Sequence, residues 1–485
     1  MAGKNIFTDW RNFTRREILK AAGCGLISLA AGSCAAEVVQ SGGERRRKPN
    51  FVIILTDDQG YQDVGCFGSP DIETPNLDRL AGGGMRFTSF YSAAPVCTPS
   101  RAALMTGCYP LRVGLPRVLH PYSFIGINAQ EKTVAEYLRE LGYATACVGK
   151  WHLGHHREFL PTRHGFDEYF GLPYSNDMLP DKSRMPPYPE LPLIEGEEVI
   201  ERNPDQSSLT TRYTERACDF IRRNKNRPFF LYLPHTMPHV PLYVSEKFRG
   251  KSRRGLYGDV IMEIDWSVGR IVATLEELGL ERDTLVFFSS DNGPWLLQGA
   301  HGGSALPLRE GKGTTFDGGQ RVPTIMSWPG TIPSGRTCGE VCAMFDLLPT
   351  LVGLAGGRTD SDRFIDGRDI APLLTGAAGA KSPHDAFYFY NAEELQAVRS
   401  GRWKFHLPHK YRSVEKAPDA KSGVRAVQKE IGRALFDIEA DPSEANDLVS
   451  AHSDIAERLE KMAVEFDAAL RAGARPPGKI AASEG

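Results

Sequence analysis

The chain of 485 residues is 41% hydrophobic and 24% charged, a composition typical of a globular protein, and its length favours two or three domains. A formal net charge of only −2 excludes the overall positive field of a protein that binds nucleic acid or an anionic membrane, so any anion site must be local. Nine cysteines do not make a disulfide scaffold, and no Cys-x-x-Cys pair indicates zinc. Cys338 and Cys342 either pair or serve as small core residues.

Residues 1–36 are predicted to be an export signal that does not belong to the fold. Residues 14–20, TRREILK, resemble a twin-arginine export motif, and the apolar run that follows is too short for a comfortable transmembrane helix. We therefore expect an exported protein in the periplasm or at the cell surface of a bacterium. Residues 37–47 are predicted to be a flexible linker.

The signal allows two mature forms. Residues 31–34 resemble a lipoprotein cleavage box, which would leave Cys34 as a lipidated N-terminus. Cleavage near Ala35 or Ala36 would instead release a free protein, and we slightly favour this form. No later stretch of the sequence is long and apolar enough to span a membrane.

Strands and helices are predicted to alternate over residues 48–382. Nearly continuous apolar runs predict buried strands, and apolar residues at helical spacing predict helices. The predicted strands are 50–55, 143–148, 229–233, 284–290 and 322–328, and the predicted helices are 131–141, 210–224 and 257–278. This alternation predicts an α/β domain in which helices cover both faces of a mostly parallel sheet.

The pattern changes over residues 383–485, which are predicted to form a smaller α+β subdomain with an antiparallel sheet and a terminal helix. The predicted strands are 386–390, 395–399, 403–407 and 434–438, and helical spacing returns after Asp454. Residues 410–429 are charged and poor in apolar residues, so we predict a loop or insertion there. This loop and the proline-rich loop 180–192 are candidates for the mouth of a pocket.

Residues 97–107, CTPSRAALMTG, are predicted to begin with a helix N-terminus. Pro99 suits a first helical turn and Gly107 can end the helix, so Cys97 is expected where free N–H groups favour an anion. Arg101 lies one helical turn further on and adds a cationic fork. Taken alone, the stretch fits a buried cysteine before an ordinary helix with a surface arginine equally well.

Two predicted strand ends carry hard oxygen ligands. Asp57 and Asp58 follow the first predicted strand, and Asp291 and Asn292 follow the fourth. Ligands in open α/β sheets collect beyond the carboxyl ends of the strands. Three carboxylates and an amide oxygen suit calcium or magnesium, and not zinc or copper. Each pair taken alone is better explained as a cap of the turn that follows it.

Cationic side chains are expected at the same edge of the sheet. Lys150 and His152 follow the second predicted strand, His239 follows the third, and Lys312 lies in a glycine-rich loop. Together with Arg101 they would bring up to five cationic donors to an oxyanion. Each of them alone would be a solvated surface residue, and the glycine-rich loop lacks the phosphate-loop pattern Gly-x4-Gly-Lys-[Ser/Thr].

The stretch 97–107 closely resembles the signature of the type I sulfatases, in which a separate maturation enzyme converts the cysteine of Cys-x-Pro-Ser-Arg into Cα-formylglycine. Residues 171–177, GLPYSND, further resemble the branch that contains arylsulfatase A and N-acetylgalactosamine-6-sulfatase. Asp317 departs from the glutamate of many relatives, and we expect no loss of chemistry from it. Further motifs similar to that family occur along the chain in the family's order, at 56–60, 149–154, 238–242, 291–293, 311–319 and 435–442.

The resemblance implies an alkaline-phosphatase-like fold and roles for the residues above. It implies one calcium ion per chain, with Arg101 beside the formylglycine. The implied calcium ligands are Asp57, Asp58, Asp291, Asn292 and the modified Cys97. The implied sulfate-binding and catalytic residues are Lys150, His152, Ser175, His239 and Lys312.

The implied chemistry explains why these residue types occur together. A hydrated aldehyde offers one hydroxyl that attacks sulfur, and a second whose deprotonation, with His152 as base, expels sulfate. His239 and Lys312 would stabilise the charge that develops on the leaving oxygen. The substrate implied by the resemblance is a sulfated sugar or an aryl sulfate.

Two alternatives remain open at this point. A phosphonate or phosphate ester hydrolase of the same superfamily could use the same residues, because the two oxyanions share their geometry. A catalytically silent, exported glycan-binding protein on the same fold is the other alternative. Loss of Cys97 or of a calcium ligand would indicate the silent protein, and none of these residues is missing.

Overall fold

The computed structural model describes residues 47–181 and 185–480. The predicted export signal, Cys34 and nearly all of the predicted linker therefore lie outside the described residues. Within the described ranges, no helix combines the length and the apolar character that crossing a bilayer requires.

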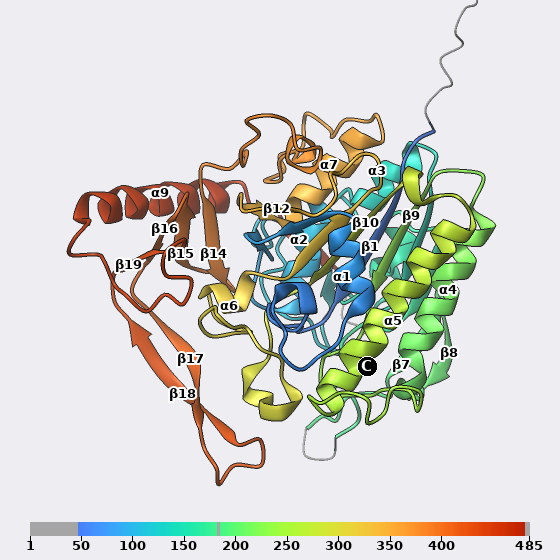
Figure 1. Cartoon of the computed structure of the whole chain (residues 1–485), viewed down its shortest axis with the longest axis horizontal. Coiled ribbons are helices and arrows are strands. Elements are labelled where there is room, and N and C mark those ends of the chain that lie inside the picture. The colour runs from blue at the N-terminus through green and yellow to red at the C-terminus, as the bar shows by residue number, and fades with distance from the viewer. Residues whose placement is uncertain (1–46, 182–184, 481–485) are drawn as a thin grey trace, which may run out of the picture. The chain divides into compact units, whose positions relative to one another are not determined.

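A ten-stranded sheet forms the centre of the fold (Figure 1). Its strand order is β12-β2-β11-β10-β1-β9-β5-β6-β7-β8. The five strands from β10 to β6 are parallel, whereas β11, β2, β7 and β8 run antiparallel to their inner neighbours. The strands are β1 (Asn50–Thr56), β2 (Met85–Phe87), β5 (Ala144–Val148), β6 (Glu168–Gly171), β7 (Pro192–Glu195), β8 (Glu198–Arg202), β9 (Phe229–Pro234), β10 (Thr284–Ser290), β11 (Thr324–Ser327) and β12 (Arg336–Cys338). The prediction of a mostly parallel sheet is confirmed, and the antiparallel strands make the sheet mixed.

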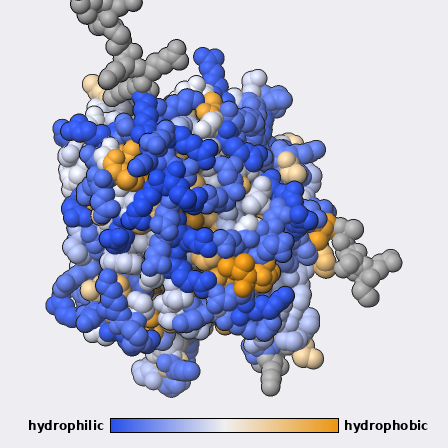
Figure 2. Space-filling view, turned by 90° about the vertical axis from the view of Figure 1, so that its right-hand side faces the viewer, coloured by the Kyte–Doolittle hydropathy of each residue, from blue (hydrophilic) through white to orange (hydrophobic). Residues whose placement is uncertain are grey.

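Helices cover both faces of this sheet, because strand β1 alternates its buried side chains between two cores. Phe51, Ile53 and Leu55 pack with α2, α3 and α7, and Val52 and Ile54 pack with α1, α4 and α5. The helices are α1 (Pro75–Gly82), α2 (Cys97–Thr106), α3 (Val134–Glu140), α4 (Leu209–Arg223), α5 (Leu256–Glu277), α6 (Asp317–Gln320), α7 (Leu347–Leu354), α8 (Ala371–Leu374) and α9 (Ser453–Ala472). The face on the α4 side of the molecule is mainly hydrophilic, with apolar residues gathered in small patches (Figure 2).

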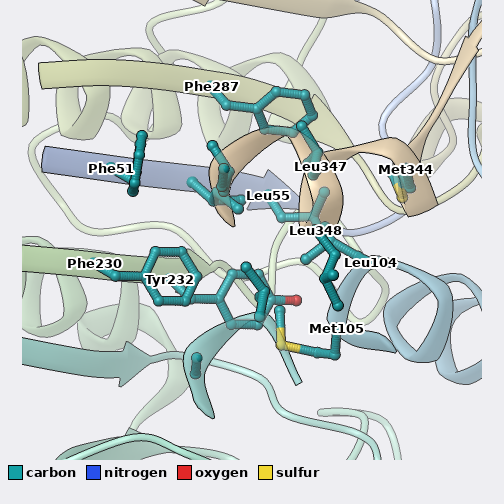
Figure 3. Close-up of a cluster of buried hydrophobic side chains, with 14 of the residues drawn as sticks. Phe51, Leu55, Leu104, Met105, Phe230, Tyr232, Phe287, Met344, Leu347 and Leu348 are labelled. Atoms are coloured by element: carbon teal, nitrogen blue, oxygen red, sulfur yellow. The ribbon is translucent and has the colours of Figure 1, made fainter. Parts of the chain in front are cut away.

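Helix α2 is buried over its whole length. It begins at Cys97, and Gly107 ends it in the left-handed conformation with a φ of 69°, as the sequence predicts. Leu104 and Met105 point into the core beside Leu55 of β1 (Figure 3). Burial of each such side chain contributes about 1.5–3 kcal/mol, so the helix start is fixed firmly against the sheet.

The C-terminal region contains the predicted antiparallel sheet, with α9 packed across it. The sheet order is β14-β15-β16-β19, and Val398 and Phe405 share a core with Leu459 of α9. A second hydrophobic core joins the small sheet to the α/β domain. In it, Phe387 of β14 packs with Tyr109 and with Ala103 of α2. The strands are β14 (Phe387–Asn391), β15 (Glu394–Ser400), β16 (Trp403–His406) and β19 (Ala434–Asp437). The boundary near residue 382 stays a prediction.

Of the prediction of a loop or insertion at 410–429, the loop is wrong. The segment forms a two-stranded antiparallel ribbon of β17 (His409–Lys416) and β18 (Val424–Ile431), which extends away from the sheets in Figure 1. Its outward positions are polar and charged, so the sequence lacks the apolar run by which the buried strands could be recognised. Smaller pairs join β3 (Phe90–Tyr91) to β13 (Cys342–Ala343) and β4 (Ile125–Gly126) to β20 (Gly478–Lys479).

Helix α3 is shorter than the predicted 131–141. Thr133 caps its N-terminus, because its side chain accepts a hydrogen bond from the Glu136 backbone while the Glu136 carboxylate accepts one from the Thr133 N–H. Cys338 and Cys342, for which pairing was one expectation, are both free and buried.

Candidate active site

The predicted acidic residues meet at the carboxyl ends of two neighbouring strands. Asp57 and Asp58 follow β1, and Asp291 and Asn292 follow β10. The two strands are parallel and pair up to their last residues, so both acidic turns leave the sheet side by side. All four side chains are buried.

Each of the three carboxylates has its own buried or nearly buried cation, and Arg101 Nη2 also lies 3.3 Å from Asp57 Oδ2. Lys150 Nζ lies 2.5 Å from Asp57 Oδ2, and Lys312 Nζ lies 2.7 Å from Asp58. Arg101 donates to Asp291 Oδ2 from Nε at 3.0 Å and from Nη2 at 2.7 Å. The formal charges of these six groups cancel, which offsets the cost of burying three carboxylates together.

The pKa values of the acidic groups follow from this arrangement. Burial would raise the pKa of Asp57, but the nearby cations, Lys150 foremost, lower it well below its usual range. Burial raises the pKa of Asp291, and the charge of Asp57 raises it further against the opposing effect of Arg101. The two neighbouring carboxyls are therefore pushed in opposite directions.

The acidic turns also contain two oxygens without a partner. Asp57 Oδ1 and Asn292 Oδ1 are buried, and among the described residues neither accepts a hydrogen bond. Asn292 donates from Nδ2 to Asp58 Oδ1 at 2.8 Å, which fixes its amide. Buried oxygens of this kind are the ligands that calcium and magnesium take, so the residues fit a hard divalent cation.

Arg101 is a buried residue of the site and not a surface arginine. Its side chain is fully buried, and Nη1 donates to the backbone carbonyl of Lys150 at 2.8 Å. Cys97 lies one helical turn before it and is 3% exposed. Burial raises the pKa of the Cys97 thiol, although Lys150 and Lys312 act in the opposite direction. An unmodified Cys97 would therefore be a thiol and a weak nucleophile at neutral pH.

The two histidines of the site are held in defined tautomers. His152 Nε2 lies 2.9 Å from the Leu119 carbonyl and must donate to it, which leaves Nδ1 unprotonated, buried and without a partner in the described chain. Burial, and then Lys150, lower the pKa of His152 well below its usual value. His239 donates from Nδ1 to the Val240 carbonyl at 2.7 Å, so its Nε2 faces Asp58 Oδ2 at 3.6 Å.

The remaining predicted residue, Ser175, lies beside Lys150. Lys150 Nζ donates to Ser175 Oγ at 3.2 Å while it also contacts Asp57. One carboxylate oxygen each of Asp57 and Asp58 and a ring nitrogen of His239 lie within 4.8 Å of one another. The fold thus brings the predicted site residues together at one edge of the sheet.

The loop that carries Lys312 is anchored from the C-terminal region. Asp317, the first residue of α6, accepts a hydrogen bond from Lys404 Nζ at 2.8 Å, and the same ammonium lies 2.9 Å from Glu444 Oε1. The three side chains are fully buried. Burial would raise the pKa of Asp317, but Lys404 and then Arg321 lower it.

Trp295 is a site residue that the sequence analysis missed. Its ring centroid lies 5.6 Å from that of His239, and Lys312 Nζ lies 4.8 Å from the Trp295 ring centroid. It stands four positions after Asp291 in the same loop, which is the only sequence signal that could have pointed to it.

Comparison with known proteins agrees with this site. The chain matches a family model described as Sulfatase over residues 49–357, and one described as the C-terminal region of aryl-sulfatase over residues 382–479. It is 40% identical to arylsulfatase A of Bos taurus over 94% of this chain and 93% of that protein. It is 42% identical to N-acetylgalactosamine-6-sulfatase of Canis lupus familiaris over 79% of this chain and 74% of that protein.

Solved structures show the same fold. The crystal structure of PsFucS1 sulfatase from Pseudoalteromonas sp. is 29% identical with a TM-score of 0.79, and the match covers 89% of this chain and 92% of that one. A phosphonate monoester hydrolase from Silicibacter pomeroyi is 17% identical with a TM-score of 0.62, over 87% of this chain and 95% of that one, and shares the fold alone. The chain therefore belongs to the sulfatase family, whose members hydrolyse sulfate esters.

Proposed function

We propose that this sulfatase releases inorganic sulfate from a sulfated sugar or an aryl sulfate. The reaction would use two groups: a formylglycine that is formed from Cys97, and one bound calcium ion. The observation that carries the proposal is the cluster of three carboxylates paired with three cations beside the start of α2. The two orphan oxygens of Asp57 and Asn292 support a metal there.

When present, the formylglycine hydrate would supply the nucleophilic hydroxyl, and a calcium ion held by Asp57, Asp58, Asp291 and Asn292 would supply positive charge beside it. Arg101 orients this end of the site, because its Nε and Nη2 both donate to Oδ2 of Asp291 and so fix that carboxylate. The maturation enzyme that forms the aldehyde is part of the proposal.

The other side chains would bind the sulfate group and move protons. Lys150, Ser175 and Lys312 present donors to its oxygens. His239 and Lys312 would stabilise the leaving oxygen. Because Nδ1–H is committed to the Val240 carbonyl, His239 would deliver a proton from Nε2 in its imidazolium form. His152 would accept a proton at Nδ1, because Nε2–H is committed to the Leu119 carbonyl.

A direct test compares 4-nitrophenyl sulfate with a 4-nitrophenyl phosphonate on protein produced together with a maturation enzyme. We expect turnover of the sulfate to dominate, and inorganic sulfate to appear in step with nitrophenol. Dominant turnover of the phosphonate would contradict the proposal and favour the alternative reaction of the superfamily. That alternative has less support, because the curated relatives compared above are sulfatases.

A further inference from the structure

A cavity of about 200 Å³ lies beside Lys312, outside the acidic turns. Its wall includes Val96, the residue before Cys97, and Trp295. On another side it is lined by Arg412 and Val414 of strand β17. The cavity thus connects the proposed reaction centre with the ribbon of β17 and β18.

The position of the cavity matches the side on which the organic part of a sulfate ester must leave the centre. The proposed function places the leaving oxygen at His239 and Lys312, and the ring of Trp295 contacts both. The Lys312 side chain is 11% exposed, whereas those of Arg101 and Lys150 are fully buried. The site therefore opens past Lys312 and Trp295 and into this cavity.

The strand β17 is fastened so that Arg412 and Val414 face the cavity. Tyr411 accepts a hydrogen bond from Arg309 Nη2 at 3.0 Å, and Ser413 donates to Glu310 Oε1 at 2.7 Å. The side chains between and beyond these two anchors then alternate toward the cavity, as in any strand. The positions of Arg412 and Val414 in the cavity wall are therefore fixed by the anchored strand β17.

Among the charged side chains that line the cavity, Arg412 is free to bind an anionic ligand. The charge of Lys312 is balanced by Asp58, and Glu310 accepts the hydrogen bond from Ser413. Over the described ranges, the exposed Arg412 guanidinium makes neither a hydrogen bond nor an ion pair. An arginine fork binds carboxylate and sulfate groups in a bidentate manner, and the indole of Trp295 offers an apolar surface to a ring.

We propose that this cavity is the leaving-group subsite, and that it takes a sulfated saccharide with a second anionic group. In this assignment, which rests on the proposed function, Trp295 packs against the sugar ring and Arg412 pairs with the second anion. That anion is a uronic-acid carboxylate or a second sulfate, since both present the same pair of oxygens to the guanidinium.

The test compares kcat/KM of matured enzyme for three disaccharides that share the scissile sulfate: one with a neutral neighbouring sugar, one with a uronic acid, and one with a second sulfate. The anionic disaccharides are expected to have the higher kcat/KM. Comparison of the uronic-acid disaccharide with the doubly sulfated one shows which anionic group Arg412 recognises. Arg412→Ala should lower the ratio of anionic to neutral kcat/KM about tenfold, the value for losing a charge-assisted hydrogen bond at a partly wet site. Arg412→Lys should recover part of it.

Arg425→Ala is the matched control. Arg425 is exposed on the same ribbon, where it lies opposite Glu415 in the strand register, and it does not line the cavity, so the ratio should stay at the wild-type value. A binding readout that needs no turnover is calorimetry on the Cys97→Ala protein, in which Arg412→Ala should weaken the anionic disaccharides about tenfold. Trp295→Ala should raise KM for all three disaccharides, and Trp295→Phe should restore it.

The outcomes separate this inference from the proposed function. Matured enzyme that hydrolyses no sulfate ester contradicts the proposed function itself. Enzyme that hydrolyses 4-nitrophenyl sulfate but prefers no anionic disaccharide, or whose preference and binding are unaltered by Arg412→Ala, overturns the subsite alone.

Discussion

The buried ammonium of Lys404 is expected to hold the C-terminal region onto the loop of the active site, and Lys404→Met tests this. The substitution keeps the length and apolar part of the side chain but removes the charge between Asp317 and Glu444. Removing one partner from a buried ion pair costs about 3–5 kcal/mol, because the remaining charges stay buried.

The structure favours the lower end of that range. Asp317 would keep the hydroxyl of Tyr91 at 2.9 Å, and Glu444 would keep His406 Nε2 at 3.0 Å and the Asp317 N–H at 2.8 Å. We therefore expect a loss of about 3 kcal/mol in the free energy of unfolding. The measurement is urea-induced unfolding of the unmatured chain, followed by tryptophan fluorescence.

Lys410→Met is the matched control, since it removes the same group from a surface pair. Lys410 Nζ lies 3.1 Å from Glu430, and the two side chains are 70% and 69% exposed. A pair of this kind contributes at most about 1 kcal/mol. If Lys404→Met and Lys410→Met unfold at the same urea concentration, the reasoning is refuted. Glu444→Gln added to Lys404→Met should recover part of the loss, because it removes one uncompensated charge.

Four further predictions concern the proposed chemistry and the response to pH. Matured protein should be about 18 Da lighter than the unmodified chain, with the difference at Cys97, and Cys97→Ala should abolish turnover without changing the urea midpoint. His239→Ala should reduce kcat more for alkyl sulfates than for 4-nitrophenyl sulfate, because a good leaving group needs no proton. Removal of divalent ions with a chelator should lower both activity and the unfolding midpoint, and added calcium should restore both. Burial lowers the pKa of His235 from 6.5 to about 4, so between these values the unfolded chain binds a proton that the folded chain does not. Stability should therefore fall as the pH drops from 6.5 towards 4, by about 3 kcal/mol for this histidine.

Each of these predictions has an outcome that contradicts it. Unmodified Cys97 in fully active protein would exclude the formylglycine. Equal losses for both leaving groups would remove the acid role of His239. Activity and stability that survive exhaustive chelation would argue against the metal. His235→Gln should flatten the acid side of the stability curve, and an unchanged slope would show that His235 is not its source.

The buried parallel strands could be predicted from sequence because both of their faces are covered. All seven residues of β1 and of β10 are buried, and each strand contains an unbroken apolar run, at 51–55 and 285–288. The ribbon of β17 and β18 and the edge strand β8 expose much of their surface. Their many polar residues leave no apolar run from which a strand could be predicted. The sequence therefore predicted the centre of the sheet better than its edges.

The residues of the site could be predicted one by one, but their partners could not. Asp291 was recognisable at a strand end, yet its pairing with Arg101 joins residues 190 positions apart. No local pattern records such a contact, and the same holds for Lys312 and Asp58. Trp295 was missed for a related reason, because a lone aromatic residue in a loop has no periodicity.

The complete burial of α2 has a consequence for the timing of maturation. All ten of its residues are buried and Cys97 is 3% exposed, so a second protein has no access to this side chain once the helix has docked. The proposed conversion of Cys97 would therefore have to precede docking. Helix α2 shares a hydrophobic core with β9 and β10. Roughly 190 residues separate Cys97 from the end of β10, and ribosomes synthesise them in about 10–40 s. If the proposed maturation is right, the fraction of active enzyme in a cell is set by a kinetic competition between the modifying enzyme and the folding of the nascent chain.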